Sequence, residues 1–160
     1  MHHTRNDLPQ KTRARIEKLL NERLADALDL AAQAKQAHWN VKGPNFIALH
    51  ELFDKVHAAV GGHVDTLAER ITALGGTARG TVQAVARAST LAAYPEDITA
   101  GGEHVAALAD RLAGFGARVR AAIDAADKLG DAGTADLFTG VSRDIDQQLW
   151  LVEAHQQAAG

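Results

Sequence analysis

Apolar and polar residues alternate along most of this chain with the period of an α-helix. In a first segment, from about Leu8 to Trp39, one helix face is apolar and carries Leu20, Leu24, Leu28, Ala31 and Ala34. The last segment begins near Thr134, a candidate N-cap, and its apolar face carries Leu137, Val141, Ile145, Leu149 and Val152. Two further helices are predicted, from about Phe46 to Leu74 and from near Asp97 to Leu129-Gly130.

The residues between these segments predict how the helices connect. Gly43-Pro44-Asn45 breaks the chain, with Asn45 as a candidate N-cap, and Gly75-Gly76 ends the second helix. The stretch from Gly75 to Pro95, roughly twenty residues, is longer than a turn between antiparallel neighbours requires. It suits a long crossover with a short helix around Val82 to Ala88. We therefore expect an all-α, ferritin-like four-helix bundle over residues 9–160, after a short polar tail over residues 1–8.

Composition narrows the chemistry that such a bundle can perform. The chain of 160 residues has no cysteine, which excludes disulfides, thiolate zinc sites and thiol catalysis. Histidine and carboxylate side chains remain as the strong metal ligands. The net charge of −3 does not favour a nucleic-acid binder at the level of the whole chain. The polar N-terminus and the lack of an apolar run of ~20 residues predict a cytoplasmic protein without a membrane partner.

Potential ligands line one side of the second helix. His50, Asp54, Asp65 and Glu69 fall within roughly 100° of one another, beside the apolar stripe. They form two pairs at i,i+4 spacing, His50 with Asp54 and Asp65 with Glu69, so the two side chains of each pair can bind the same metal ion. The pairs are ~16 Å apart along the helix axis. No single metal centre on one chain can use both pairs.

The two pairs are symmetric about a point between Ala59 and Val60. Small residues surround this point, namely Ala58, Ala59, Gly61 and Gly62. Each glycine inside a helix lowers the stability of the helix by about 1 kcal/mol relative to alanine, so the pair calls for a structural explanation. An antiparallel copy of the helix, crossing on a two-fold axis, would bring Asp65 and Glu69 of one chain to His50 and Asp54 of the other. His38, at the end of the first helix, would complete a site suited to iron.

Simpler interpretations exist for each of these residues. A single histidine on a helix face is usually packed or solvated, and acids beside Arg70 can form an ordinary solvated face with salt bridges. A metal-free structural bundle is therefore the residual alternative. An iron centre inside each subunit, as in larger ferritins, would need Glu-x-x-His spacing on the helices, which does not occur at a suitable position.

Several ordered motifs resemble one family along nearly the whole chain. They are Lys35-Gln36-Ala37-His38-Trp39-Asn40, residues 45–54 (NFIALHELFD), residues 63–70 (HVDTLAER), Tyr94-Pro95, residues 142–146 (SRDID) and Leu149-Trp150. Together they resemble the Dps family of ferritin-like mini-ferritins. The Gly61-Gly62 pair is a departure from what we expect in the middle of this helix.

The resemblance implies a hollow homo-dodecamer that oxidises ferrous iron, with hydrogen peroxide or oxygen as oxidant, and stores ferric mineral. It implies iron ligands at two-fold interfaces: His38, His50 and Asp54 from one subunit, with Asp65 and Glu69 from its partner. It places Trp39 near the site, although a buried anchor is the simpler role for this side chain. It also matches Asp136 and Asp146 to acidic residues of the three-fold pores through which iron enters.

DNA binding is the rival function, since many Dps proteins bind DNA through a lysine-rich tail. The cations near the N-terminus are Arg5, Lys11, Arg13 and Arg15, of which the last three lie inside the predicted helix. His2-His3 reads as a loose, solvated end, and residues 155–160 contain no Lys or Arg. We therefore place ferroxidase and storage first, and nucleoid compaction with secondary iron chemistry, in a nucleoid-associated protein, as the alternative.

Overall fold

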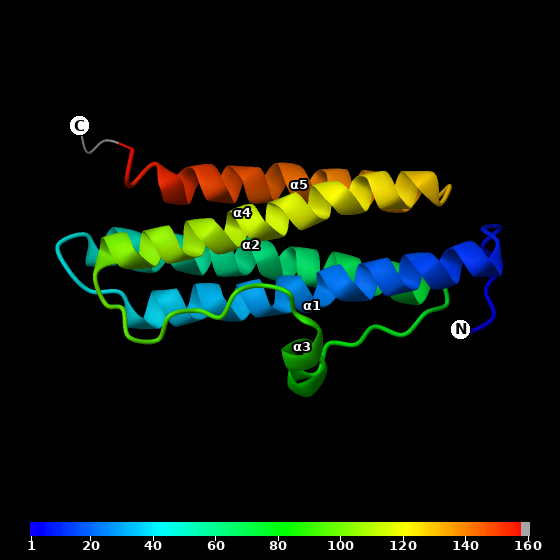
Figure 1. Cartoon of the computed structure of the whole chain (residues 1–160), viewed down its shortest axis with the longest axis horizontal. Coiled ribbons are helices and arrows are strands. Elements are labelled where there is room, and N and C mark those ends of the chain that lie inside the picture. The colour runs from blue at the N-terminus through cyan, green and yellow to red at the C-terminus, as the bar shows by residue number, and fades with distance from the viewer. Residues whose placement is uncertain (158–160) are drawn as a thin grey trace.

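The computed structural model describes residues 1–157 and shows two antiparallel helix pairs packed together. The helices of this part are α1 (Gln10–Asn40), α2 (Phe46–Ala73), α3 (Val82–Ala88), α4 (Gly101–Lys128) and α5 (Ala132–Glu153). α1 pairs with α2 and α4 pairs with α5, while the short α3 lies beside α1 (Figure 1). The predicted four-helix bundle is confirmed, and so is its long crossover with a helix at residues 82–88. Of the predicted domain 9–160, residues 158–160 lie outside the described part.

Two helix starts differ from the predictions. α4 begins at Gly101 rather than near Asp97, because the Glu103 carboxylate accepts hydrogen bonds from the backbone N–H groups of Thr99 and Ala100. α5 begins after Asp131, whose side chain accepts from the Thr134 N–H at 2.9 Å. The prediction that Thr134 is the N-cap was wrong. Asp131 lies three residues earlier and is the stronger cap, because its carboxylate satisfies a free donor of the first turn.

The core consists of the apolar faces of all four long helices. Phe53, Phe115 and Phe138 are fully buried at its centre. Gly75, with φ +82°, ends α2 in the left-handed conformation that favours glycine. No helix within residues 1–157 is both long and apolar enough to cross a membrane.

Side chains of α1 hold the crossover against the bundle. The buried Asp26 carboxylate accepts from the Thr90 N–H at 2.7 Å, and Asp29 accepts from the Ser89 hydroxyl. Gln33 donates to the Ala92 carbonyl at 3.1 Å. The long connection is thus an ordered layer over α1, and it positions Tyr94 against the bundle.

Candidate metal centre

His38 and His50 form a stacked pair where α1 ends and α2 begins. Their ring centroids are 3.7 Å apart and their planes differ by 22°. Nδ1 of His38 lies 2.7 Å from the carbonyl oxygen of His50, and Nδ1 of His50 lies 2.8 Å from the carbonyl oxygen of His38. A carbonyl only accepts, so this pattern assigns the proton to Nδ1 of each ring. In this tautomer of the neutral ring, Nε2 is the lone-pair donor with which histidine binds a metal.

Asp54 lines the same cavity as the two histidines. The cavity, of about 470 Å³, is lined by His38, His50, Glu51, Asp54, Lys55 and Ala58. Glu51 was not singled out from the sequence, although its position ~100° from His50 puts it at the edge of the same helix face. The structure therefore brings three of the five predicted ligands to one cavity and adds a carboxylate.

Lys35 on α1 forms an ion pair with the exposed Asp54 carboxylate. The hydrogen bond from Lys35 lowers the pKa of Asp54. Slight desolvation opposes this shift, while the charges of Lys35, His38 and His57 add to it. Lys35 thus keeps Asp54 in the anionic form, which is the form that binds a cation. Lys35 also occupies the carboxylate and therefore competes with a metal ion for it. Sequence reasoning missed Lys35, because its contact depends on how α1 and α2 pack.

Asp65 and Glu69 lie on the exposed side of α2, away from the histidine cavity. Neither carboxylate has a hydrogen bond or ion pair within residues 1–157. Arg70, which could have paired with them, instead binds Asp131 at 2.8 Å and Thr134 at 3.0 Å. In this described part, no three His, Asp or Glu side chains are close enough to hold one ion.

The small-residue stretch between the two ligand pairs faces open space. A Cβ added at Gly61 or Gly62 would meet nothing within 4 Å apart from neighbouring backbone of the same helix. Ala58, one turn earlier, is also exposed. Packing within the subunit therefore does not require glycine at these positions.

Trp39 and the two predicted pore acids are all exposed. The Trp39 side chain is 66% exposed, so it is not a buried anchor within the subunit. It lines a cavity of about 670 Å³ between α1, α3 and the crossover. Asp136 lies on the surface of α5, and Asp146 forms an ion pair with Arg120 at 2.8 Å.

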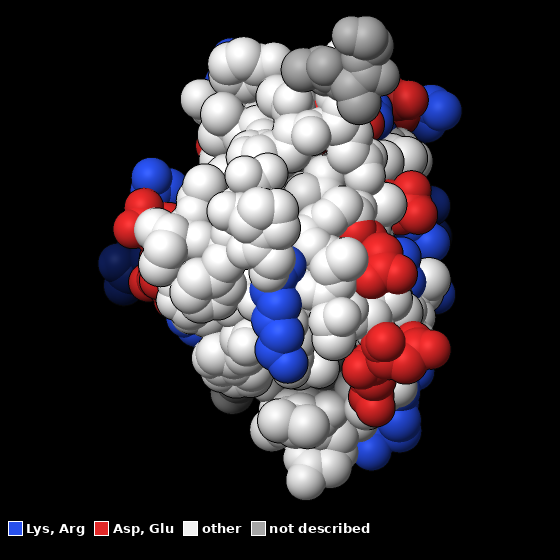
Figure 2. All heavy atoms as spheres, turned by 90° about the vertical axis from the view of Figure 1, so that its left-hand side faces the viewer, with Lys and Arg blue, Asp and Glu red and all other residues white. Residues whose placement is uncertain are grey.

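The cations predicted to contact DNA differ in their accessibility. Arg5, Lys11 and Arg15 are exposed, but Arg13 is buried and donates to the carbonyl oxygens of Leu8 and Leu74 at 3.0 and 2.9 Å. The tail is not loose along its whole length, because the His2 N–H donates to the Gly75 carbonyl at 2.7 Å. The end of the bundle seen in Figure 2, where α1 ends and α4 begins, shows scattered charges and no continuous basic surface.

A four-helix bundle with one long crossover, carrying histidine and carboxylate side chains suited to a metal, has the architecture of a ferritin-like protein. A family model for the ferritin-like domain matches residues 17–159. The match thus includes all five predicted ligands.

Comparison with individual relatives identifies the family within the ferritin-like proteins. A DNA protection during starvation protein from Agrobacterium fabrum is 49% identical over 156 residues, which cover 98% of this chain and 96% of the relative. The solved Dps of Mycobacterium smegmatis is 32% identical and superposes with a TM-score of 0.92, covering 100% of this chain and 91% of that one. A Dps from Microbacterium arborescens, solved in a high iron form, is 31% identical with a TM-score of 0.86, covering 96% of this chain and 97% of that one. The chain belongs to the Dps family of ferritin-like proteins, a family of general iron-storage and protective function.

Proposed function

We propose that this chain is a ferroxidase and iron-storage subunit whose catalytic sites are each built by two copies. Iron is its substrate, hydrogen peroxide or oxygen its oxidant, and a hollow cytoplasmic dodecamer its working form. The observation that carries the proposal is the cavity lined by His38, His50 and Asp54, where Nδ1 of each ring is bound to a backbone carbonyl and Nε2 is free of such a bond. The cavity needs further ligands, and α2 carries two carboxylates, Asp65 and Glu69, that have no partner within residues 1–157.

A two-fold axis through the small-residue stretch of α2 would complete the site. The open space at Gly61 and Gly62 lets a second α2 approach closely in the antiparallel direction. Asp65 and Glu69 of the partner subunit would then face His38, His50 and Asp54. The dodecamer itself rests on the resemblance to the Dps family.

The ligand set suits oxidation of ferrous iron. Imidazole nitrogens bind Fe(II) well, while carboxylate oxygens favour the harder Fe(III) product. Two ferrous ions give one electron each to one peroxide, which takes up two protons and leaves as two waters. Because both electrons go to one peroxide, no hydroxyl radical is released. The high-iron form of the Microbacterium arborescens relative supports iron as the substrate.

Ferrous oxidation tests this proposal directly. Purified protein would be loaded anaerobically with Fe(II), and Fe(III) formation followed optically after addition of peroxide or oxygen. A His50→Ala/Asp54→Ala variant should lose the fast phase while size-exclusion chromatography shows an intact oligomer. A His155→Ala/Asp110→Ala variant removes the same residue types from exposed positions outside the cavity, so it should retain the fast phase. Equal rates in all three proteins would reject these ligands.

DNA compaction is the second candidate, because the relatives carry the name of a DNA protection protein. Each phosphate contact needs an available cation, and burial of Arg13 leaves Arg5, Lys11 and Arg15 near the N-terminus. Replacing these three by glutamine should leave a low-salt gel shift unchanged. A shift that weakens in the variant would instead place DNA binding on this segment.

A further inference from the structure

Tyr94 and His104 form a hydrogen-bonded pair that the proposed iron site does not use. The Tyr94 hydroxyl lies 2.8 Å from Nδ1 of His104, and the two rings stack with centroids 6.0 Å apart. Tyr94 belongs to the crossover and His104 to the first turns of α4, so the pair forms only in the folded chain. Tyr94 is also the only tyrosine of the sequence.

The surroundings of the pair hold the proton on the phenol. Burial raises the pKa of Tyr94, and the charge of Arg111 opposes this only in part. Burial also lowers the pKa of His104, against opposing effects of the Ile98 backbone, Glu103 and the Asn40 backbone. At neutral pH the phenol therefore donates its hydrogen bond to a neutral imidazole.

The second ring nitrogen of His104 lies near the backbone of Ile98 and Asn40, but makes no well-formed hydrogen bond in the described part of the chain. The His104 side chain is 1% exposed, and its Nε2 has no hydrogen-bond partner within residues 1–157. A buried polar atom left in this way costs stability, so packing alone does not favour a histidine here. An acceptor for the Tyr94 proton is a role that an apolar residue cannot fill.

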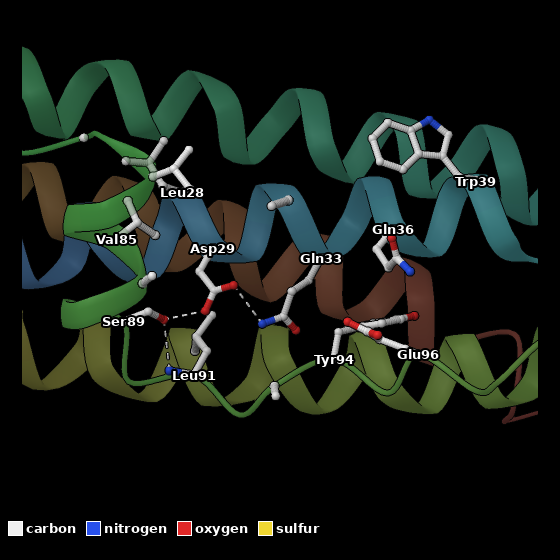
Figure 3. A pocket seen from close by; sticks show the side chains of 15 residues that line it. Leu28, Asp29, Gln33, Gln36, Trp39, Val85, Ser89, Leu91, Tyr94 and Glu96 are labelled. Carbon is white, nitrogen blue, oxygen red and sulfur yellow. Dashed lines mark hydrogen bonds between the residues drawn. The ribbon is translucent and has the colours of Figure 1, made fainter.

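Two aromatic residues lie close to the pair and are neighbours of predicted iron ligands in the sequence. Phe53, one residue before Asp54 on α2, has its ring centroid 6.4 Å from that of His104. Trp39, directly after His38, lines the same cavity as Tyr94, with Gln36 between them in the close view (Figure 3). The pair therefore lies near the segments of α1 and α2 that carry His38 and Asp54.

We propose that Tyr94 is a one-electron donor to the iron site, with His104 as the acceptor of its proton. The inference rests on the proposed ferroxidase function. When a single ferrous ion meets peroxide, it supplies one electron, and the products are Fe(III), hydroxide and a hydroxyl radical. Tyr94 supplies the second electron, which converts that radical to hydroxide. The phenol O–H bond breaks, the proton moves to Nδ1 of His104, and a neutral tyrosyl radical remains on Tyr94.

A later ferrous ion restores the pair. Its electron reduces the tyrosyl radical, the proton returns from His104, and Tyr94 is a phenol again. The sum is two ferrous ions oxidised for each peroxide, as in the paired reaction. Arg111, whose guanidinium carbon is 5.7 Å from the centre of the Tyr94 ring, disfavours a cationic radical, so electron and proton leave together.

The chain contains few other residues that can give up one electron. It has no cysteine, one methionine and two tryptophans. Trp39 and Trp150 are 66% and 59% exposed, so a radical on either ring would be open to solvent. Tyr94 is partly buried and its hydroxyl is hydrogen-bonded to a proton acceptor, so we expect the radical to reside on Tyr94.

Electron paramagnetic resonance on freeze-quenched samples tests the proposal. The oligomeric protein would be loaded with one ferrous ion per site, mixed with peroxide and frozen, and Fe(III) formation would be measured in the same samples. A tyrosyl signal should form, narrow when the protein carries ring-deuterated tyrosine, and vanish in Tyr94→Phe. A Trp150→Phe variant is the matched control and should keep the signal.

The outcomes separate this proposal from the proposed function. Fe(III) formation that depends on His50 and Asp54 without a tyrosyl signal would overturn the role of Tyr94 alone, as would a radical located on Trp39. Loss of ligand-dependent Fe(III) formation would overturn the ferroxidase proposal itself. In that case a photochemical one-electron oxidant, applied to iron-free protein, tests whether Tyr94 is still the residue oxidised.

The role of His104 needs a readout that a structural effect would not change. His104→Gln should shorten the lifetime of the Tyr94 radical, because the proton is no longer kept at Nδ1. In the native protein, D₂O should slow radical formation, which tests proton movement even if the variant does not fold. An unchanged rate in D₂O, or an unchanged lifetime in a folded His104→Gln protein, would remove His104 as proton acceptor.

Discussion

His38 and His50 each donate a hydrogen bond from Nδ1 to the backbone carbonyl of the other residue. This reciprocal arrangement ties the last turn of α1 to the first turn of α2 across the break at residues 41–45. It also selects the Nδ1–H tautomer of each neutral ring, which leaves Nε2 as the nitrogen that a metal can bind. Preorganisation of this kind lowers the entropic cost of binding.

Removal of either imidazole should weaken iron binding strongly. In His38→Ala or His50→Ala, the affinity for Fe(II) should fall by about 100-fold or more, because loss of an outer-shell partner alone costs 10–100-fold. Each variant also frees the carbonyl that its imidazole bound. Anaerobic titration measures the affinity, with His155→Ala as control. An affinity within a factor of about two of the native value would argue against a ligand role.

Lys35→Met should change the pH dependence of metal binding. Lys35 lowers the pKa of Asp54, so its loss raises that pKa and moves the acid limit of metal binding to higher pH. Above that limit binding should tighten about two- to fivefold, since the metal no longer competes with an exposed ion pair for the Asp54 carboxylate. Titration with Co(II) at several pH values measures both effects. Weaker binding at neutral pH would show that Lys35 supports the site rather than competing with the metal.

Mixed oligomers should reveal whether two subunits build each site. His50→Ala/Asp54→Ala and Asp65→Ala/Glu69→Ala proteins should each be inactive. In a dimer of one subunit of each kind, one of the two sites regains every ligand. Random co-assembly of equal amounts should thus restore about a quarter of the sites. Fe(III) formation after unfolding and joint refolding measures this, and each variant refolded alone is the control. No recovery in assembled mixtures would mean that the carboxylates serve their own chain.

Substitutions at Gly61 and Gly62 should affect folding of the subunit and assembly of the oligomer differently. Gly61→Ala should stabilise the helix by about 1 kcal/mol, because an added Cβ would meet no other element of residues 1–157 within 4 Å. Gly61→Leu/Gly62→Leu should fold but fail to pair, if a second α2 crosses here. Circular dichroism follows the fold and analytical ultracentrifugation the mass. An oligomer of native size with leucine at both positions would place the two-fold contact elsewhere on the subunit.

The sequence by itself determined the helices and the position of potential ligands on them. Helical periodicity depends on neighbours three and four residues apart, so it placed His50, Asp54, Asp65 and Glu69 on one side of α2. Their separation along the axis already excluded one centre on a single chain. The crossover helix at residues 82–88 followed from the length of the connection and its local pattern.

The tertiary structure decided every contact between elements. The reciprocal bonds of His38 and His50, the pairing of Lys35 with Asp54 and the burial of Arg13 depend on the rotation and axial register of packed helices. Tyr94 and His104 likewise meet only because α1 holds the crossover in place. Sequence periodicity specifies which face of a helix is apolar. Which polar residues meet across two helices is settled by side-chain packing, where a shift of one turn changes every partner.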